Sequence, residues 1–132
     1  MGCKILTSSQ LKKKEERRLR ILKRKEAEEK YKKWRSDIYQ RDNNICMCCN
    51  KDLSCVNPHN KQAHHILDKK NYKELMLDLN NGVLLCYYCH KMSPLSPHMS
   101  SLAFVEVLKV KKPYQYEYLL EFLKKKSLAS SH

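Results

Sequence analysis

The sequence has no run of eighteen apolar residues, and its first thirty residues are rich in charge. A membrane-spanning helix needs about 20 mostly apolar residues, and a secretory signal peptide needs an apolar centre, so neither class fits. We therefore expect an intracellular protein, in the cytoplasm or in a nucleus. Because such compartments keep thiols reduced, we interpret the seven cysteines as thiolate ligands rather than disulfides.

Proline and glycine are also absent from residues 11–39, which consist mostly of strong helix formers. This stretch predicts a long helix. Its first part has few apolar residues, as is typical of a solvated or phosphate-contacting helix. Tyr31, Trp34 and Ile38 then form one apolar stripe that should pack on a domain. We therefore expect a basic helical arm over residues 1–33 and a globular domain from Trp34 onward.

Acidic residues are scarce, with 14 Asp and Glu against 27 Lys and Arg and a net charge of +13. Residues 1–41 hold 15 basic against 6 acidic residues, residues 42–98 hold 6 against 5, and residues 99–132 hold 6 against 3. A nearly neutral centre with basic ends favours a polyanionic partner, foremost DNA or RNA, because phosphate contacts release counterions. An anionic membrane surface is the less favoured alternative.

The rest of the chain predicts short elements. Asp42-Asn43-Asn44 should end the first helix. Residues 61–67 and 82–87 predict the two strands of a hairpin, joined by a polar loop. In a C-terminal extension over residues 99–132, Ser100 or Ser101 could cap one helix and Pro113 could open another, with fraying from Lys124.

Four cysteines form two C-x-x-C pairs, Cys46 with Cys49 and Cys86 with Cys89. Two such pairs supply the four thiolates of a closed, tetrahedral zinc site, which leaves no position open for a substrate. We therefore expect a structural zinc ion that stabilises a small core. The first pair is ambiguous, because Cys46 with Cys48 is also conceivable.

Histidine and asparagine follow in a fixed order: His64-His65, then Asn81, then His90 directly after the second cysteine pair. Together with the cysteine pairs, this order resembles the HNH endonuclease family, the ββα-metal nucleases, in a phage-type branch with two zinc knuckles. The resemblance covers roughly residues 34–98. It implies an α+β fold, with a small ββα-metal core and a structural four-cysteine zinc, flanked by the basic N-terminal helix and C-terminal helices.

The resemblance also implies a role for each residue. His65 is the general base that activates water, and His64 replaces the more common aspartate as first ligand of a catalytic divalent metal. His90 is the second ligand, and Asn81 orients the base through backbone hydrogen bonds. Phosphodiester hydrolysis suits these residue types, because neutral imidazole is a base near neutral pH and a cation stabilises the developing negative charge. Adjacent strand residues face opposite ways, so the histidine pair can divide these tasks.

With His64 and His90 as its ligands, the catalytic metal would have no negatively charged protein ligand. Mg²⁺, which prefers oxygen, is then expected to bind less well than Mn²⁺, Ni²⁺ or Zn²⁺. A different interpretation stays open, in which one histidine of the pair joins a mixed zinc site and Cys48 is left over.

Several further side chains have simpler expected positions. We expect His98 at the surface, although it could approach the phosphate or replace His90 as a ligand. Tyr87 and Tyr88 could stack on a base or sugar, with one of them packed into the core. Cys55 is expected to be an ordinary thiol.

These features predict a metal-dependent endonuclease that hydrolyses DNA phosphodiester bonds, with its N-terminal helix bound to the phosphate backbone. The alternative is a non-catalytic, zinc-stapled nucleic-acid-binding module of a phage or mobile-element DNA-processing assembly. A composition rich in lysine and asparagine fits such a source. In a third interpretation the N-terminal helix is an arm that binds a protein partner in such an assembly.

Overall fold

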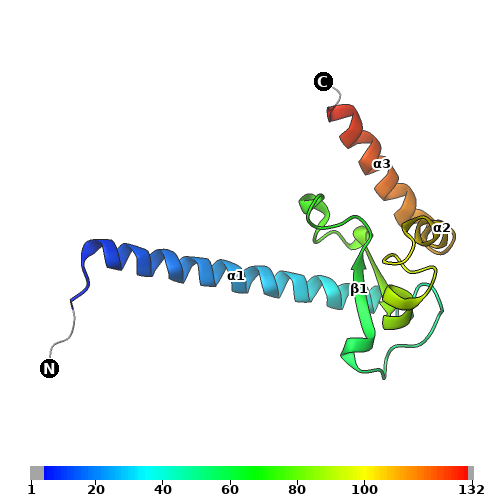
Figure 1. Ribbon diagram of the computed structural model, residues 1–132, viewed down its shortest axis with the longest axis horizontal. Helices are drawn as coiled ribbons and strands as arrows, with labels where there is room; N and C mark the ends of the chain where they lie inside the picture. Colours follow the sequence, from blue (N-terminus) through cyan, green and yellow to red (C-terminus); the bar gives the residue numbers. More distant parts are fainter. Residues whose placement is uncertain (1–4, 131–132) are drawn as a thin grey trace. The chain divides into compact units, whose positions relative to one another are not determined.

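A computed structural model describes residues 5–130, which contain three α-helices, two strands and several single helical turns (Figure 1). The chain divides into two compact units, one ending at Lys33 and the other starting at Trp34. No helix within the described residues has the length and apolar character that a membrane span needs. The mixture of helices with a small antiparallel sheet confirms the α+β class.

Helix α1 (Ser8–Arg41) confirms the long helix predicted from residues 11–39 and extends it at both ends. It stops because the backbone after it leaves the helical region: Asn43 and Asn44 have φ values of 54° and 56°. Asparagine is one of the few residues that adopt this left-handed conformation readily. The predicted break at this point is therefore confirmed.

The strands β1 (Lys61–His65) and β2 (Gly82–Cys86) form an antiparallel pair, as predicted, and each is slightly shorter than expected. His65 lies opposite Gly82 in the register, and His64 lies opposite Val83. Every residue of β2 is buried, so both faces of this strand are covered. The two histidines of β1 consequently lie in two different environments.

Glycine at position 82 lets α1 pack closely on the sheet. A Cβ atom there would lie 2.1 Å from Ile38 Cδ1 and 2.6 Å from Trp34 Cζ2. Trp34 and Ile38 are both buried, as their stripe predicted. The indole of Trp34 also donates a hydrogen bond to the Asp78 carbonyl at 3.0 Å, which fixes the loop before β2.

After β2 the chain forms one π-helical turn, η4 (Tyr88–Met92), rather than a longer helix. Ser93 ends the turn in extended backbone, the conformation favoured by a residue that precedes proline. The side chains of Tyr87 and Tyr88 are 47% and 60% exposed. The expectation that one of them packs into the core is therefore wrong, because the turn directs both outward.

Two C-terminal helices complete the second unit: α2 (Ser101–Lys111) and α3 (Pro113–Ser130). The side chain of Ser100 caps α2 by accepting a hydrogen bond from Ala103 N, and Pro113 opens α3, as predicted. Helix α3 continues well past Lys124, where we expected fraying. The buried Gln115 fastens α3 to β2 by donating to the Gly82 carbonyl at 3.0 Å.

A buried carboxylate connects three parts of this unit. Asp42 accepts hydrogen bonds from Arg41 at 2.9 and 3.0 Å, from Leu84 N at 3.2 Å and from Lys112 Nζ at 3.1 Å. Burial raises the pKa of Asp42, but the hydrogen bonds and charges of Arg41 and Lys112 outweigh it and hold the pKa below 3.8. The end of α1, strand β2 and the α2–α3 junction therefore meet at one anion.

Candidate functional site

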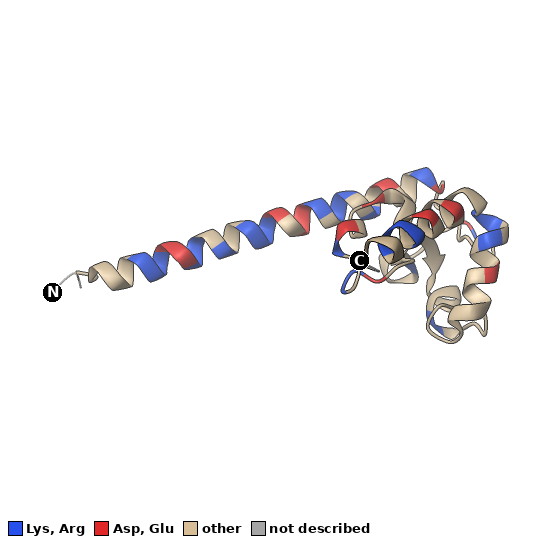
Figure 2. Cartoon of the chain, turned by 90° about the horizontal axis from the view of Figure 1, so that it is seen from above, with Lys and Arg blue, Asp and Glu red and all other residues tan. Residues whose placement is uncertain are grey.

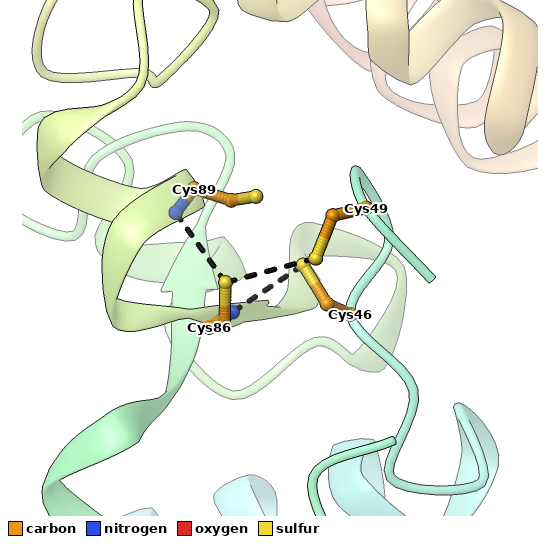
Figure 3. Close-up of side chains that lie close together, drawn as sticks. All are labelled: Cys46, Cys49, Cys86 and Cys89. Carbon is orange, nitrogen blue, oxygen red and sulfur yellow. Dashed lines mark hydrogen bonds between the residues drawn. The ribbon is translucent and has the colours of Figure 1, made fainter. Parts of the chain in front are cut away.

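Four cysteine side chains converge from two segments that are far apart in the sequence (Figure 3). Cys46 and Cys49 come from the loop after α1, and Cys86 and Cys89 come from the end of β2 and from η4. Their sulfur atoms all lie within 4.8 Å of one another. This cluster could hold a metal ion such as zinc.

Backbone amides also point at these sulfurs. Cys86 N donates to Cys46 Sγ, and Cys89 N donates to Cys86 Sγ, both at 3.4 Å. Such bonds stabilise a thiolate, whereas burial raises the pKa of Cys46 and disfavours one. A bound cation resolves this conflict, because metal binding replaces the thiol protons.

Cys48 lies outside the cluster, so the first C-x-x-C pair is Cys46 with Cys49, and no histidine among residues 5–130 takes part in the cluster. Burial raises the pKa of Cys48 to about 11, which keeps it a thiol. Cys55 is an exposed free thiol, as expected.

A second cluster consists of three histidines, His64, His90 and His98. His64 Nδ1 and His98 Nε2 each lie 3.1 Å from His90 Nε2. The three candidate ligand atoms lie within 4.8 Å of one another. A single imidazole nitrogen has either one proton or one lone pair, so His90 Nε2 cannot form two well-directed hydrogen bonds at once, whereas a cation among the three nitrogens would satisfy all of them.

The His98 ring is exposed, as expected, but the expectation of a simple surface residue was incomplete. It joins His64 and His90 rather than replacing His90. The neighbouring Ser96 is fully buried, and its carbonyl accepts a hydrogen bond from Ser100 N at 2.8 Å. This turn brings His98 back toward η4.

His64, which is partly buried, and His90, which is buried, are neutral at physiological pH. Burial and the nearby rings of His90 and His98 lower the pKa of His64 to about 3. Burial, His98 and the charge of Lys91 lower the pKa of His90 to about 4. Neutral imidazoles are the form that binds a metal ion. His90 Nδ1 is buried and has no hydrogen-bond partner among the described residues.

His65 lies on the other side of β1 and is held in a defined tautomer. Its Nε2 lies 2.9 Å from the Met76 carbonyl, which can only accept, so Nε2 carries the proton and Nδ1 carries the lone pair of the neutral ring. The ring stacks on Trp34, with centroids 4.2 Å apart and planes 8° from parallel. Burial lowers the pKa of His65, although the Met76 carbonyl opposes this shift.

Asn81 is fully buried and fastens the loop that holds His65. Its Oδ1 accepts from Leu67 N at 2.7 Å, and its Nδ2 donates to the carbonyls of Leu67 at 2.9 Å and Leu75 at 3.2 Å. Leu75 directly precedes Met76, whose carbonyl contacts His65. Asn81 therefore holds in place the loop whose Met76 carbonyl contacts His65.

Comparison with known protein families, with curated protein sequences and with solved structures gave no match to this chain. The candidate site is therefore defined by its own geometry. It consists of a four-cysteine cluster, a three-histidine cluster and His65, whose tautomer is fixed by the Met76 carbonyl.

Proposed function

We propose that this chain is a metal-dependent endonuclease of the HNH type, which hydrolyses phosphodiester bonds in DNA. One observation carries the proposal: adjacent residues of β1 place His64 in a cluster suited to a metal ion and His65 in a fixed neutral tautomer. Hydrolysis of a phosphodiester needs both a base for water and positive charge near the phosphate. A histidine pair with a purely structural role would need neither a metal-binding cluster around one ring nor a fixed tautomer of the other.

In this mechanism the neutral His65 accepts a proton from water at Nδ1, and the resulting hydroxide attacks phosphorus. The bond to the leaving oxygen breaks, and that oxygen takes a proton from solvent. Met76 and Asn81 keep the imidazole oriented, because Nε2 keeps its proton and donates it in a hydrogen bond to the Met76 carbonyl. Burial keeps His65 deprotonated near neutral pH, as a base must be.

A divalent ion on His64, His90 and His98 would supply positive charge beside the phosphate and leave positions open for its oxygens. Three neutral nitrogen ligands favour Mn²⁺, Ni²⁺ or Zn²⁺ over Mg²⁺. The four-cysteine cluster offers no open position, so its zinc is structural in this proposal.

The test is cleavage of supercoiled plasmid by purified zinc-loaded protein with added Mn²⁺, Ni²⁺ or Mg²⁺. We expect metal-dependent nicking or cutting, and we expect His65→Ala to lower the rate by roughly 10²–10⁴-fold, the usual contribution of a general base. His59→Ala is the matched control, because His59 is exposed and lies outside both clusters. Zinc content and thermal unfolding establish that each variant is folded.

Absence of cleavage with every metal would reject the enzyme and favour the non-catalytic nucleic-acid-binding module. Equal rates for His65→Ala and the wild type would reject His65 as the base. Cleavage that depends on metal and on His65, with His59→Ala unaffected, supports the proposal.

A further inference from the structure

Residues 8–33 of α1 carry twelve Lys and Arg against five Glu. Every one of these charged side chains is exposed, so neither burial nor packing neutralises the excess. Figure 2 shows the basic positions as blue segments along the helix, interrupted by red acidic ones. Helical periodicity gathers four of these basic side chains on one face.

We call this face the basic stripe. It consists of Lys13, Arg17, Arg20 and Arg24, which are spaced i, i+4, i+7 and i+11 in the sequence. At 3.6 residues per turn, the four positions fall within an arc of about 60° and span about 16 Å along the axis. The same periodicity places all five glutamates of the segment outside this arc. None of the four side chains forms an ion pair with another residue between 5 and 130.

Another face has as many cations, but two of them are paired with glutamates. We call it the control face. It lies about 100° around the helix axis from the basic stripe and consists of Lys14, Arg18, Lys25 and Lys32. Arg18 pairs with Glu15 and Lys32 with Glu29, each at 3.8 Å. The two faces carry the same number of positive charges and differ in how many of these charges are paired with glutamate.

We propose that the basic stripe binds the phosphate backbone of duplex DNA, with α1 lying in or along the major groove. Three of its four cations are arginines, whose planar guanidinium groups suit phosphate oxygens. The major groove of B-DNA admits an α-helix, whereas the major groove of duplex RNA is deep and narrow. This binding requires neither the metal nor His65. The DNA-binding proposal can therefore be tested independently of the proposed nuclease activity.

The test measures binding of the full zinc-loaded chain to a labelled DNA duplex by fluorescence anisotropy at a series of salt concentrations. No divalent metal is added beyond the loaded zinc, so that cleavage is avoided. The stripe variant is K13Q/R17Q/R20Q/R24Q, and the matched control is K14Q/R18Q/K25Q/K32Q. Each removes four positive charges, and glutamine retains a good helix propensity, which circular dichroism verifies.

We expect the stripe variant to reduce the salt slope of log K by about 3 to 4, the value for four lost phosphate contacts, and the control by less than half as much. Equal losses would show diffuse attraction without a docking face and overturn the proposal, as would no loss in either variant. Equal affinity and slope on duplex RNA would overturn the groove fit. Tighter, stripe-dependent binding to phosphatidylserine-containing vesicles would assign the stripe to membranes instead.

Discussion

At the scale of single residues, the direction of a side chain decides its chemistry. His64 and His65 are neighbours in the sequence, yet one ring joins His90 and His98 while the other stacks on Trp34. Successive side chains of β1 point to opposite faces of the sheet, and this separates the two rings. The binding of a cation and the acceptance of a proton can therefore be arranged side by side without competing for the same nitrogen.

His98 provides a test of the three-histidine cluster. In zinc-loaded protein, we expect His98→Ala to weaken Ni²⁺ binding by more than the roughly 10–100-fold that loss of an outer hydrogen-bond partner of a ligand costs. The reason is that a direct ligand is lost while His64 and His90 remain. Isothermal titration with Ni²⁺ measures the effect, and His59→Ala is the control. An unchanged affinity would show that His98 contacts the cluster without binding metal.

At the scale of elements, η4 connects the two clusters. Cys86 ends β2, Cys89 lies in the turn, and His90 follows directly. A zinc ion on the cysteines would thus fix the backbone from which His90 projects. Because the sheet has only two strands, much of its stability should come from the metal, on the order of 10 kcal/mol in zinc-finger peptides.

Exchange of cysteine for serine tests this element. We expect Cys49→Ser to lose zinc and to lower the midpoint of thermal unfolding strongly, because three thiolates remain where four are needed. Cys48→Ser is the matched control, since Cys48 is the adjacent residue outside the cluster. Elemental analysis and calorimetry measure the two effects. The opposite order of the variants would assign Cys48 to the knuckle in place of Cys49.

At the scale of the whole second unit, Asp42 holds distant segments together, and its stability contribution depends on pH. Its pKa in the folded protein lies below 3.8, so the contribution is present above pH 3.8 and is lost as the pH falls through the folded value. We expect Asp42→Asn to lower the free energy of unfolding at neutral pH by about 3 kcal/mol, because Arg41 and Lys112 lose their counter-charge. We also expect a flatter acid dependence.

Urea unfolding at a series of pH values measures both effects. Asp68→Asn is the control, because Asp68 is exposed and its hydrogen bonds go to Asn71 in its own loop. Parallel pH profiles for Asp42→Asn and the wild type would contradict the assignment of the acid dependence to this carboxylate.

Local patterns predicted the elements well. A stretch free of proline and glycine predicted α1, two short β-rich segments predicted the strands, and C-x-x-C spacing predicted which sulfurs meet. The spacing works because it places two thiolates on one turn, which depends on nearby backbone alone. Ser100 and Pro113 likewise marked helix starts through local chemistry.

Contacts between distant segments could not be predicted in this way. His98 follows two prolines, and its return toward His90 depends on hydrogen bonds of the Ser96 backbone that no side-chain pattern reveals. Lys112 meets Asp42 seventy positions away. The outward direction of Tyr87 and Tyr88 depends on the shortness of η4. Each of these features is a product of tertiary packing rather than of propensity.

The compactness of η4 has a consequence for how the sequence can vary. Three of the seven side chains in the two clusters, Cys86, Cys89 and His90, lie within five consecutive residues. Inserting or deleting one residue there would displace ligands of both clusters at once, whereas the exposed residues 68–71 of the loop after β1 contribute no ligand to either cluster. Related chains that keep both clusters should therefore preserve the length of this segment while their loops differ in length.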